Sequence, residues 1–195
     1  MPAPLRASSQ ERLEAAPLRS GTLSFDGRAT VGDFTGVTAA TRGRMTGGSL
    51  EEVTGWVVAQ VDSLTTKNDR RDRDLRKSME TDKFPTMRFD LSGVEVESRA
   101  GDSAVVTLVG RFSIHGVERA QRLPARLYFD DGAVRVTGSF PMNLHDYRIG
   151  GLSKMLGILK MHPDIMVHID LVFAPASEAT APPEAGQGAR RSTRE

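Results

Sequence analysis

The sequence predicts an all-β protein whose antiparallel strands close into a barrel. Two observations lead to this fold class. First, apolar and polar residues alternate with a period of two over several segments between residues 18 and 174, as in strands that have one buried face. Second, turn residues separate these segments, and helical patterns are few. Each strand has a single apolar face, so a barrel is favoured over a sandwich, and closure also removes exposed sheet edges.

The first strands carry the weaker signal and the later ones the clearer signal. Leu23 and Phe25 alternate with polar neighbours, and less regular patterns occupy residues 34–45 and 53–64. The clear strands are expected at residues 103–115, 123–130, 134–142 and 165–173. His115 falls on the polar face of the first of these, and Asp130-Asp131-Gly132 provides hairpin turn residues after the second.

A short charged helix is expected over residues 69–80. Asp72 lies near its start, where a carboxylate favours the N-terminal end of a helix. Asp69 and Arg73, and likewise Asp72 and Arg76, have the i,i+4 spacing of helical ion pairs. The helix surface is therefore expected to be solvated and self-paired, although its basic residues could alternatively meet a phosphate or polar headgroup.

Apolar residues determine how this helix and a second one can pack. Leu75 and Met79 form the only apolar stripe of the first helix, so one narrow edge is expected to pin it to the barrel. Residues 152–161 have a broader apolar face and predict a second helix that closes or lines one end of the barrel.

Composition limits the classes of partner and compartment. The chain has 195 residues, enough for one domain, and its 26 Lys and Arg nearly balance 25 Asp and Glu, so no nucleic-acid partner is indicated. It has no cysteine, which leaves the redox compartment open. Charges divide the N-terminus, so the chain as written has neither a signal peptide nor a membrane span. That start predicts a cytoplasmic protein, or a periplasmic one if the N-terminus is trimmed or misassigned.

The domain boundaries follow from the same composition. Residues 1–17 are expected to be a flexible segment, residues 18–174 the barrel domain, and residues 175–195 a disordered tail rich in Pro, Ala, Gly and charge.

The order of motifs resembles that of the YceI-like family. The matching segments, in chain order, are Val31-Gly32-Asp33-Phe34-Thr35-Gly36, Ser63-Leu64-Thr65-Thr66, Arg71-Asp72-Arg73-Asp74-Leu75, Phe84-Pro85-Thr86-Met87-Arg88-Phe89, the run 110–117 and Leu144-His145-Asp146-Tyr147-Arg148-Ile149. The resemblance covers about residues 22–173. It departs at the opening strand, which lacks the usual His-Ser or aromatic start, and at the N-terminus, where many members carry an export signal.

The resemblance implies an eight-stranded, lipocalin-like barrel that carries or sequesters an isoprenoid, quinone-like or other lipid ligand along its axis. The protein would then be a binder and not an enzyme, with no cofactor, no integral membrane segment and a possible homodimer. The ligand-binding candidates are Phe25, Phe34, Trp56, Leu108, Phe112, Phe140, Tyr147 and Ile169, and the polar candidates at the barrel mouth are Thr65 and Asp146. Each of the aromatic residues has the alternative role of filling a core.

Inward glycines and alanines, among them Gly110 and Gly138, could leave space for a ligand or could permit the bends that a barrel needs. The sequence leaves these two explanations open.

Two other classes of function stay open. A small hydrolase or isomerase could use the barrel as its pocket and His145 or Asp146 for proton transfer, but no second catalytic group is apparent. A protein-interaction module could use the charged helix or the C-terminal tail. The four histidines lack the spacing of a metal site, so neither metal nor catalytic residues are assigned.

Overall fold

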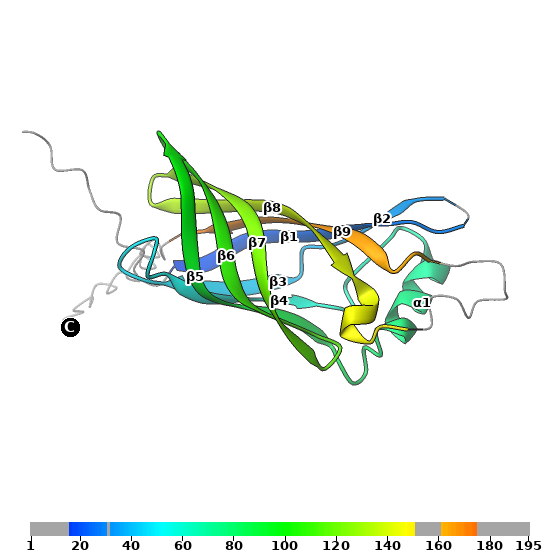
Figure 1. Cartoon of the computed structure of the whole chain (residues 1–195). Helices are drawn as coiled ribbons and strands as arrows, with labels where there is room; N and C mark the ends of the chain where they lie inside the picture. The colour runs from blue at the N-terminus through cyan, green and yellow to red at the C-terminus, as the bar shows by residue number, and fades with distance from the viewer. Residues whose placement is uncertain (1–15, 31, 151–160, 175–195) are drawn as a thin grey trace, which may run out of the picture.

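The computed structural model describes residues 16–30, 32–150 and 161–174, and these form an antiparallel barrel (Figure 1). The strands are β1 (Ala16–Gly27), β2 (Phe34–Thr38), β3 (Thr41–Thr46), β4 (Thr54–Gln60), β5 (Thr86–Ala100), β6 (Ser103–Ile114), β7 (Val117–Asp130), β8 (Ala133–Asn143) and β9 (Asp164–Phe173). Helix α1 (Asp69–Ser78) follows β4, and a single 3-10 turn, η1 (Leu144–Tyr147), follows β8.

The nine segments make an eight-stranded barrel, which confirms the predicted fold class. Segments β2 and β3 pair with β1 in one continuous register, since Leu23 lies opposite Thr38 and Ala16 lies opposite Met45. They are therefore two halves of one strand, interrupted at residues 39–40.

The barrel closes where the first strand meets the last. Strand β1 pairs with β9 from Leu18 opposite Phe173 to Asp26 opposite Met166. Strand β1 begins at Ala16, so Ala16 and Pro17, which the sequence placed in the N-terminal segment, belong to the sheet. Ala16 is buried, because its side chain faces the barrel interior next to Met45.

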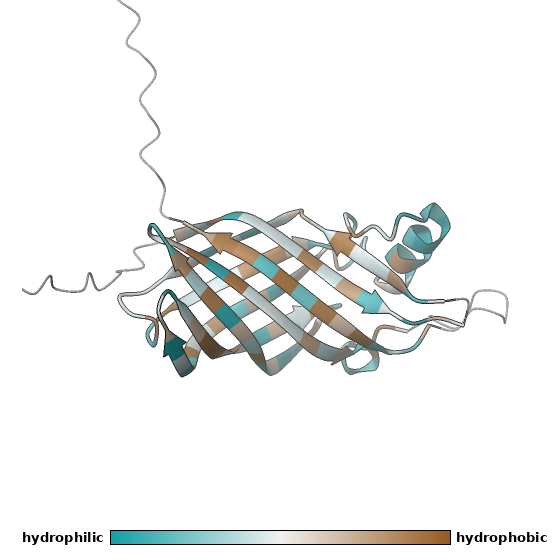
Figure 2. Ribbon diagram, turned by 90° about the horizontal axis from the view of Figure 1, so that it is seen from above, coloured by the Kyte–Doolittle hydropathy of each residue, from teal (hydrophilic) through white to brown (hydrophobic). Residues whose placement is uncertain are grey.

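The predicted alternation is confirmed on the later strands. The inward residues of β6 and β9 belong to the buried core, among them Val106, Phe112, Val167 and Leu171, while the residues between them are more exposed. Figure 2 shows the same alternation as brown and teal bands along the strands. The interior is thus packed mainly with apolar side chains contributed by every strand.

The expected place of His115 on a strand face is wrong. Strand β6 ends at Ile114, and His115 (φ 52°) and Gly116 (φ 72°) form the two-residue turn into β7. Two consecutive positive φ angles are typical of the tight hairpin turns that match strand twist. The turn directs the His115 ring against Phe84, with ring centroids 4.8 Å apart.

Two inward glycines lie where a neighbouring strand approaches closely. A Cβ at Gly110 would overlap the backbone carbonyl of Asp90, and one at Gly138 would lie 2.8 Å from the carbonyl oxygen of Pro124. At both positions a side chain would meet a neighbouring strand and not an open cavity. These contacts argue against the explanation that the two glycines leave space for a ligand, because a neighbouring backbone already occupies that space.

The second predicted helix, residues 152–161, lies outside the described residues except for Met161, which forms an isolated bridge with Ala29. Helix α1 has ten residues. No helix within the described ranges has the length and hydropathy that crossing a membrane requires.

Candidate functional site

Helix α1 covers one end of the barrel, which we call the α1 end (Figure 1). The helix begins after Asn68, whose side-chain oxygen accepts a hydrogen bond from the Arg71 backbone N–H at 3.0 Å. Asp72 lies in the first turn, as expected, but the capping side chain is that of Asn68, which the charge pattern does not single out.

Asp72 fastens the helix to the loop that precedes it. Its carboxylate accepts hydrogen bonds from the Thr65 hydroxyl at 2.8 Å, the Thr66 backbone N–H at 2.8 Å and the Thr66 hydroxyl at 2.6 Å. Burial opposes ionisation of this carboxyl, which is 6% exposed, but the hydrogen bonds and the nearby Arg76 outweigh burial and lower its pKa. Asp72 therefore stays ionised and holds the loop against the helix.

The two predicted i,i+4 pairs of α1 have different outcomes: the charge of Arg76 attracts Asp72 and helps to lower its pKa, whereas the pairing of Asp69 with Arg73 is wrong. Within the described part of the chain, no ion pair joins Asp69 to Arg73, and the Asp72 carboxylate binds threonines while Arg76 donates to the backbone oxygen of Asp62 at 3.2 Å. The Arg71 guanidinium lies 4.3 Å from the centroid of the Phe34 ring, a cation–π contact at the barrel rim.

Two apolar cavities, each of about 50 Å³, lie inside the barrel. The α1-end cavity lies beneath α1 and η1, with Leu75, Met79 and Leu144 in its lining. The hairpin-end cavity lies toward the turn between β7 and β8, with Leu127 and Val134 in its lining. The described linings contain no charged side chain, and Ser78 provides their only hydroxyl group.

Methionines make up much of the wall of the α1-end cavity. Met79, Met87, Met142 and Met161 all line it, together with leucine, isoleucine, valine and phenylalanine side chains. Methionine is unbranched and flexible, so such a wall can change shape more readily than one of branched residues. From the sequence, Met79 is predicted only as a helix anchor, whereas the alternation of the strand at residues 134–142 places Met142 on the inward face.

The structure brings some of the predicted ligand-binding residues to the cavities and not others. Phe25 and Phe112 line the α1-end cavity, and Leu108 lines the hairpin-end cavity. Phe140 and Tyr147 are buried and pack their rings 6.4 and 6.3 Å from that of Phe112. Ile169 packs against the core from β9.

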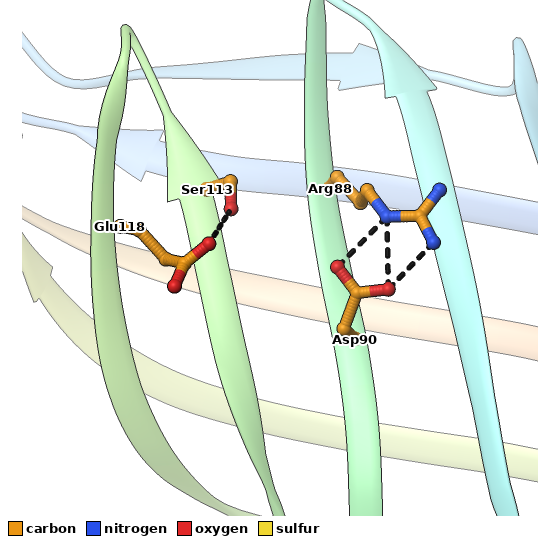
Figure 3. A network of polar contacts seen from close by, with 4 residues as sticks. All are labelled: Arg88, Asp90, Ser113 and Glu118. Carbon is orange, nitrogen blue, oxygen red and sulfur yellow. Dashed lines mark hydrogen bonds and ion pairs between the residues drawn. The ribbon is translucent and has the colours of Figure 1, made fainter.

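Trp56 and Phe34 lie differently from the other aromatic candidates. Trp56 borders the hairpin-end cavity, but on β4 it lies directly opposite Asp90, so it shares the outer face with Arg88 and Asp90. The Arg88 guanidinium lies 5.0 Å from the centroid of the Trp56 ring. Asp90 on the same strand accepts hydrogen bonds from this guanidinium (Figure 3). Phe34 lines an outer cleft and packs edge-on against Phe25.

The same close-up shows how the outer face of the sheet is occupied. Ser113 on β6 and Glu118 on β7 lie across the hairpin from one another and form a hydrogen bond of 3.4 Å (Figure 3). Glu118 also pairs with Arg111. These contacts are exposed, and they indicate a solvated outer surface opposite the apolar interior.

The polar candidates at the mouth are already engaged. The Thr65 hydroxyl donates to Asp72, and the Asp146 carboxylate lies 3.6 Å from the Arg119 guanidinium. His145 and Asp146 are both exposed and outside the described lining of the cavities. The structure therefore does not bring them together with a second catalytic group in a shared pocket.

His115 and Tyr147 join three elements at the α1 end. One His115 ring nitrogen, Nδ1, lies 3.2 Å from the Tyr147 backbone oxygen, and Nε2 lies 3.1 Å from Glu80 Oε2 without the alignment of a hydrogen bond. Burial raises the pKa of the Tyr147 phenol, although Gln121 donates a hydrogen bond to its oxygen at 3.0 Å. These groups link three elements, namely the β6–β7 turn, the turn that follows α1, and turn η1.

A second polar row crosses the closure of the barrel on its outer face. His168 Nδ1 lies 2.7 Å from the Ser139 hydroxyl, and His168 Nε2 lies 2.9 Å from the Asp26 carboxylate. Two hydrogen bonds lower the pKa of the Asp26 carboxyl. The one from Thr35 has the larger effect, and the one from His168 the next largest. The row contains the residue types of a hydrolase triad, but it lies on the outer face, outside the described linings of both cavities.

Among the described residues, no three His, Asp or Glu side chains cluster as they would around a metal ion.

Comparison with known proteins agrees with this architecture. The family model described as YceI-like domain matches residues 17–173. A polyisoprenoid binding domain from Saccharophagus degradans, implicated in plant cell wall breakdown, has a similar structure, with a TM-score of 0.69 and 14% identity over 82% of this chain and 97% of that one. BcnA from Burkholderia cenocepacia has a TM-score of 0.65 and 12% identity over 78% of this chain and 95% of that one. At these identities the likeness establishes the shared barrel fold. No curated protein matches the sequence.

Proposed function

The chain belongs to the YceI-like family, and from this premise we propose that it binds the apolar tail of an isoprenoid, quinone-like or other lipid amphiphile inside its barrel. The observation that carries the proposal is the α1-end cavity, which lies inside a closed barrel and has no charged group in its described lining. Such a site favours hydrocarbon, because burial of apolar surface contributes about 25 cal/mol per Å² before the cost of ordering the ligand.

The cavities are small, so a lipid tail can bind only if side chains move. An engineered cavity of about 150 Å³ holds benzene, and each cavity here is about 50 Å³. A lipid tail must therefore displace side chains as it enters. The four methionines of the α1-end cavity are suited to this, because each can change rotamer without the strain of moving a branched side chain.

The similarity to the Saccharophagus degradans domain supports the same class of ligand, since that protein is described as polyisoprenoid binding. The polar head of the ligand would stay outside, at the α1 end, where the loop that carries Thr65 and turn η1 with Asp146 both lie. Both residues remain candidates to orient the head. A hydrolase or isomerase that uses His145 or Asp146 has no comparable support, because neither side chain belongs to the described lining of a cavity.

The test is to extract the purified protein with organic solvent, identify released lipids by mass spectrometry, and titrate the extracted protein with a fluorescent polyprenyl probe. We expect a co-purified lipid and saturable binding. Ser78→Trp, which fills the α1-end cavity from α1, should weaken probe binding by at least about tenfold. Arg73→Trp adds the same ring to an exposed position of α1 and should leave binding unchanged. An extract without lipid, together with no saturable probe binding, would contradict the proposal.

A further inference from the structure

The interior of the barrel is divided by an aromatic pair. Phe89 on β5 lies directly opposite Phe112 on β6, and their ring centroids are 5.8 Å apart. Phe112 lines the α1-end cavity, and Phe89 lines the hairpin-end cavity. The two rings thus stand between the cavities, one facing each.

Phe112 is braced on two further sides. Its ring packs at a steep angle against Phe140 of β8 and against Tyr147 of η1, at interplanar angles of 63° and 67°. Tyr147 is itself 1% exposed and is held by the hydrogen bond from Gln121. An aromatic ring fixed by two edge-to-face contacts resists displacement more than the methionines around it.

This contrast gives the α1-end cavity a rigid floor and adaptable walls. The depth of the cavity follows from its described lining. Several strands contribute two successive inward residues each, such as Phe112 and Ile114 of β6 or Ile165 and Val167 of β9. Two successive inward residues cover roughly 7 Å along a strand, so the cavity is about that deep. A tail that enters at the α1 end can therefore widen the cavity by moving methionines, but it reaches Phe112 after a short distance.

Resting on the proposed function, we infer that Phe112 sets the length of the lipid tail that the barrel accepts. The α1-end cavity takes about one or two isoprene units, and the remainder of a longer chain stays outside the barrel. Removing the Phe112 ring joins the two cavities and admits a longer tail.

The experiment compares geraniol, with two isoprene units, and geranylgeraniol, with four, by competition against a fluorescent geranyl probe. For the unmodified full-length protein, geranylgeraniol should bind no more tightly than geraniol, because its additional carbons gain no burial. For Phe112→Ala, geranylgeraniol should bind at least about tenfold more tightly than geraniol, because those carbons enter the hairpin-end cavity. Phe112→Leu keeps more of the core volume and should shift the ratio in the same direction, which protects the test if Phe112→Ala does not fold.

Leu127→Ala is the matched control, because it enlarges the hairpin-end cavity and leaves the aromatic pair in place. It should keep the ratio of the unmodified protein. The inference is overturned if the unmodified protein already prefers geranylgeraniol by tenfold, or if both Phe112 variants keep its ratio while still binding geraniol. Failure of every variant and of the unmodified protein to bind either alcohol would instead overturn the proposed function, and the inference with it.

Discussion

At the scale of single residues, the Asp72 carboxylate attaches α1 to the loop that precedes it. It accepts three hydrogen bonds from Thr65 and Thr66 while almost completely buried. Its pKa is lowered in the folded protein, so its ionisation stabilises the fold above the ordinary carboxyl pKa of about 4, and this stabilisation is lost as the pH falls through the lower folded value.

Asp72→Asn should lower the free energy of unfolding by about 1–3 kcal/mol at pH 7, because an amide leaves donors of the threonine loop without an acceptor. The difference from the unmodified protein should shrink at pH 3, below the ordinary carboxyl pKa, because the unfolded chain then binds a proton at Asp72 more readily than the folded protein does. Urea unfolding followed by the fluorescence of the single tryptophan measures both values. Asp74→Asn removes the same charge from a carboxylate that has no hydrogen-bond partner among the described residues, and it should change stability by less than about 0.5 kcal/mol at either pH. Equal effects of the two substitutions would contradict this account.

The sequence predicted the faces of residues only where alternation was unambiguous. Phe112 and Phe140 lie in regular strands, and their burial follows from the pattern. Trp56 lies in β4 among Gly55, Val57 and Val58, where both faces carry apolar residues, so period-two reasoning cannot tell inward from outward. The role of Asp72 depends on a loop that folds back onto the helix, which local charge spacing does not encode.

At the scale of elements, strands β5 and β6 show how the sheet bends. The pairing shifts between Leu91 and Gly93, and the Ser92 hydroxyl donates to the backbone oxygen of Val109 at 3.0 Å. Gly110 lies opposite Leu91, immediately beside this bulge. A bulge increases the local bend and twist of a strand, and the missing side chain of Gly110 lets the Asp90 backbone approach.

Gly110→Ala should therefore destabilise the protein by about 1–3 kcal/mol, because the new methyl group overlaps the Asp90 carbonyl and crowds Phe89. Gly93→Ala is the matched control on the partner strand, since a Cβ there would meet no atom of the described residues within 4 Å, its chain neighbours aside. Its effect should stay within about 0.5 kcal/mol. Thermal and urea unfolding of both variants measure the difference, and a Gly110→Ala protein as stable as Gly93→Ala would show that the bend does not need the glycine.

Element positions were predictable to different degrees. The sequence placed α1, β6, β8 and β9 close to their observed bounds, because alternation and helical charge placement are local signals. It expected β7 only from residue 123, whereas the strand begins at Val117. It did not predict the interruption at residues 39–40 or the bulge beside Gly110. Both depend on how neighbouring strands coil around the barrel, which no single segment specifies.

At the scale of the whole molecule, the ends of the described sheet meet. Leu18 pairs with Phe173, and the Ala174 backbone N–H donates to the Pro17 oxygen at 3.3 Å. Closure thus joins the first strand to the last, and both contribute inward residues to the same core.

A chain limited to residues 16–174 should retain the free energy of unfolding of the full chain, measured by urea unfolding, to within about 0.5 kcal/mol, because it keeps every described strand. Removing residues 16–19 as well should lower stability by several times that amount, since it deletes the pairing of Ala16 and Pro17 with β3 and exposes the end of β9. A large loss of stability already in the 16–174 chain would show that the segments outside it contribute to the fold.

The closure of β1 onto β9 also determines how the protein can be tethered. Strand β1 begins and β9 ends beside the hairpin-end cavity, whereas α1 covers the opposite end (Figure 1). A fusion partner or a surface linkage joined to either strand end is attached at the pole opposite α1. The barrel can thus be immobilised or presented in an array with the end that we propose for ligand entry directed outward.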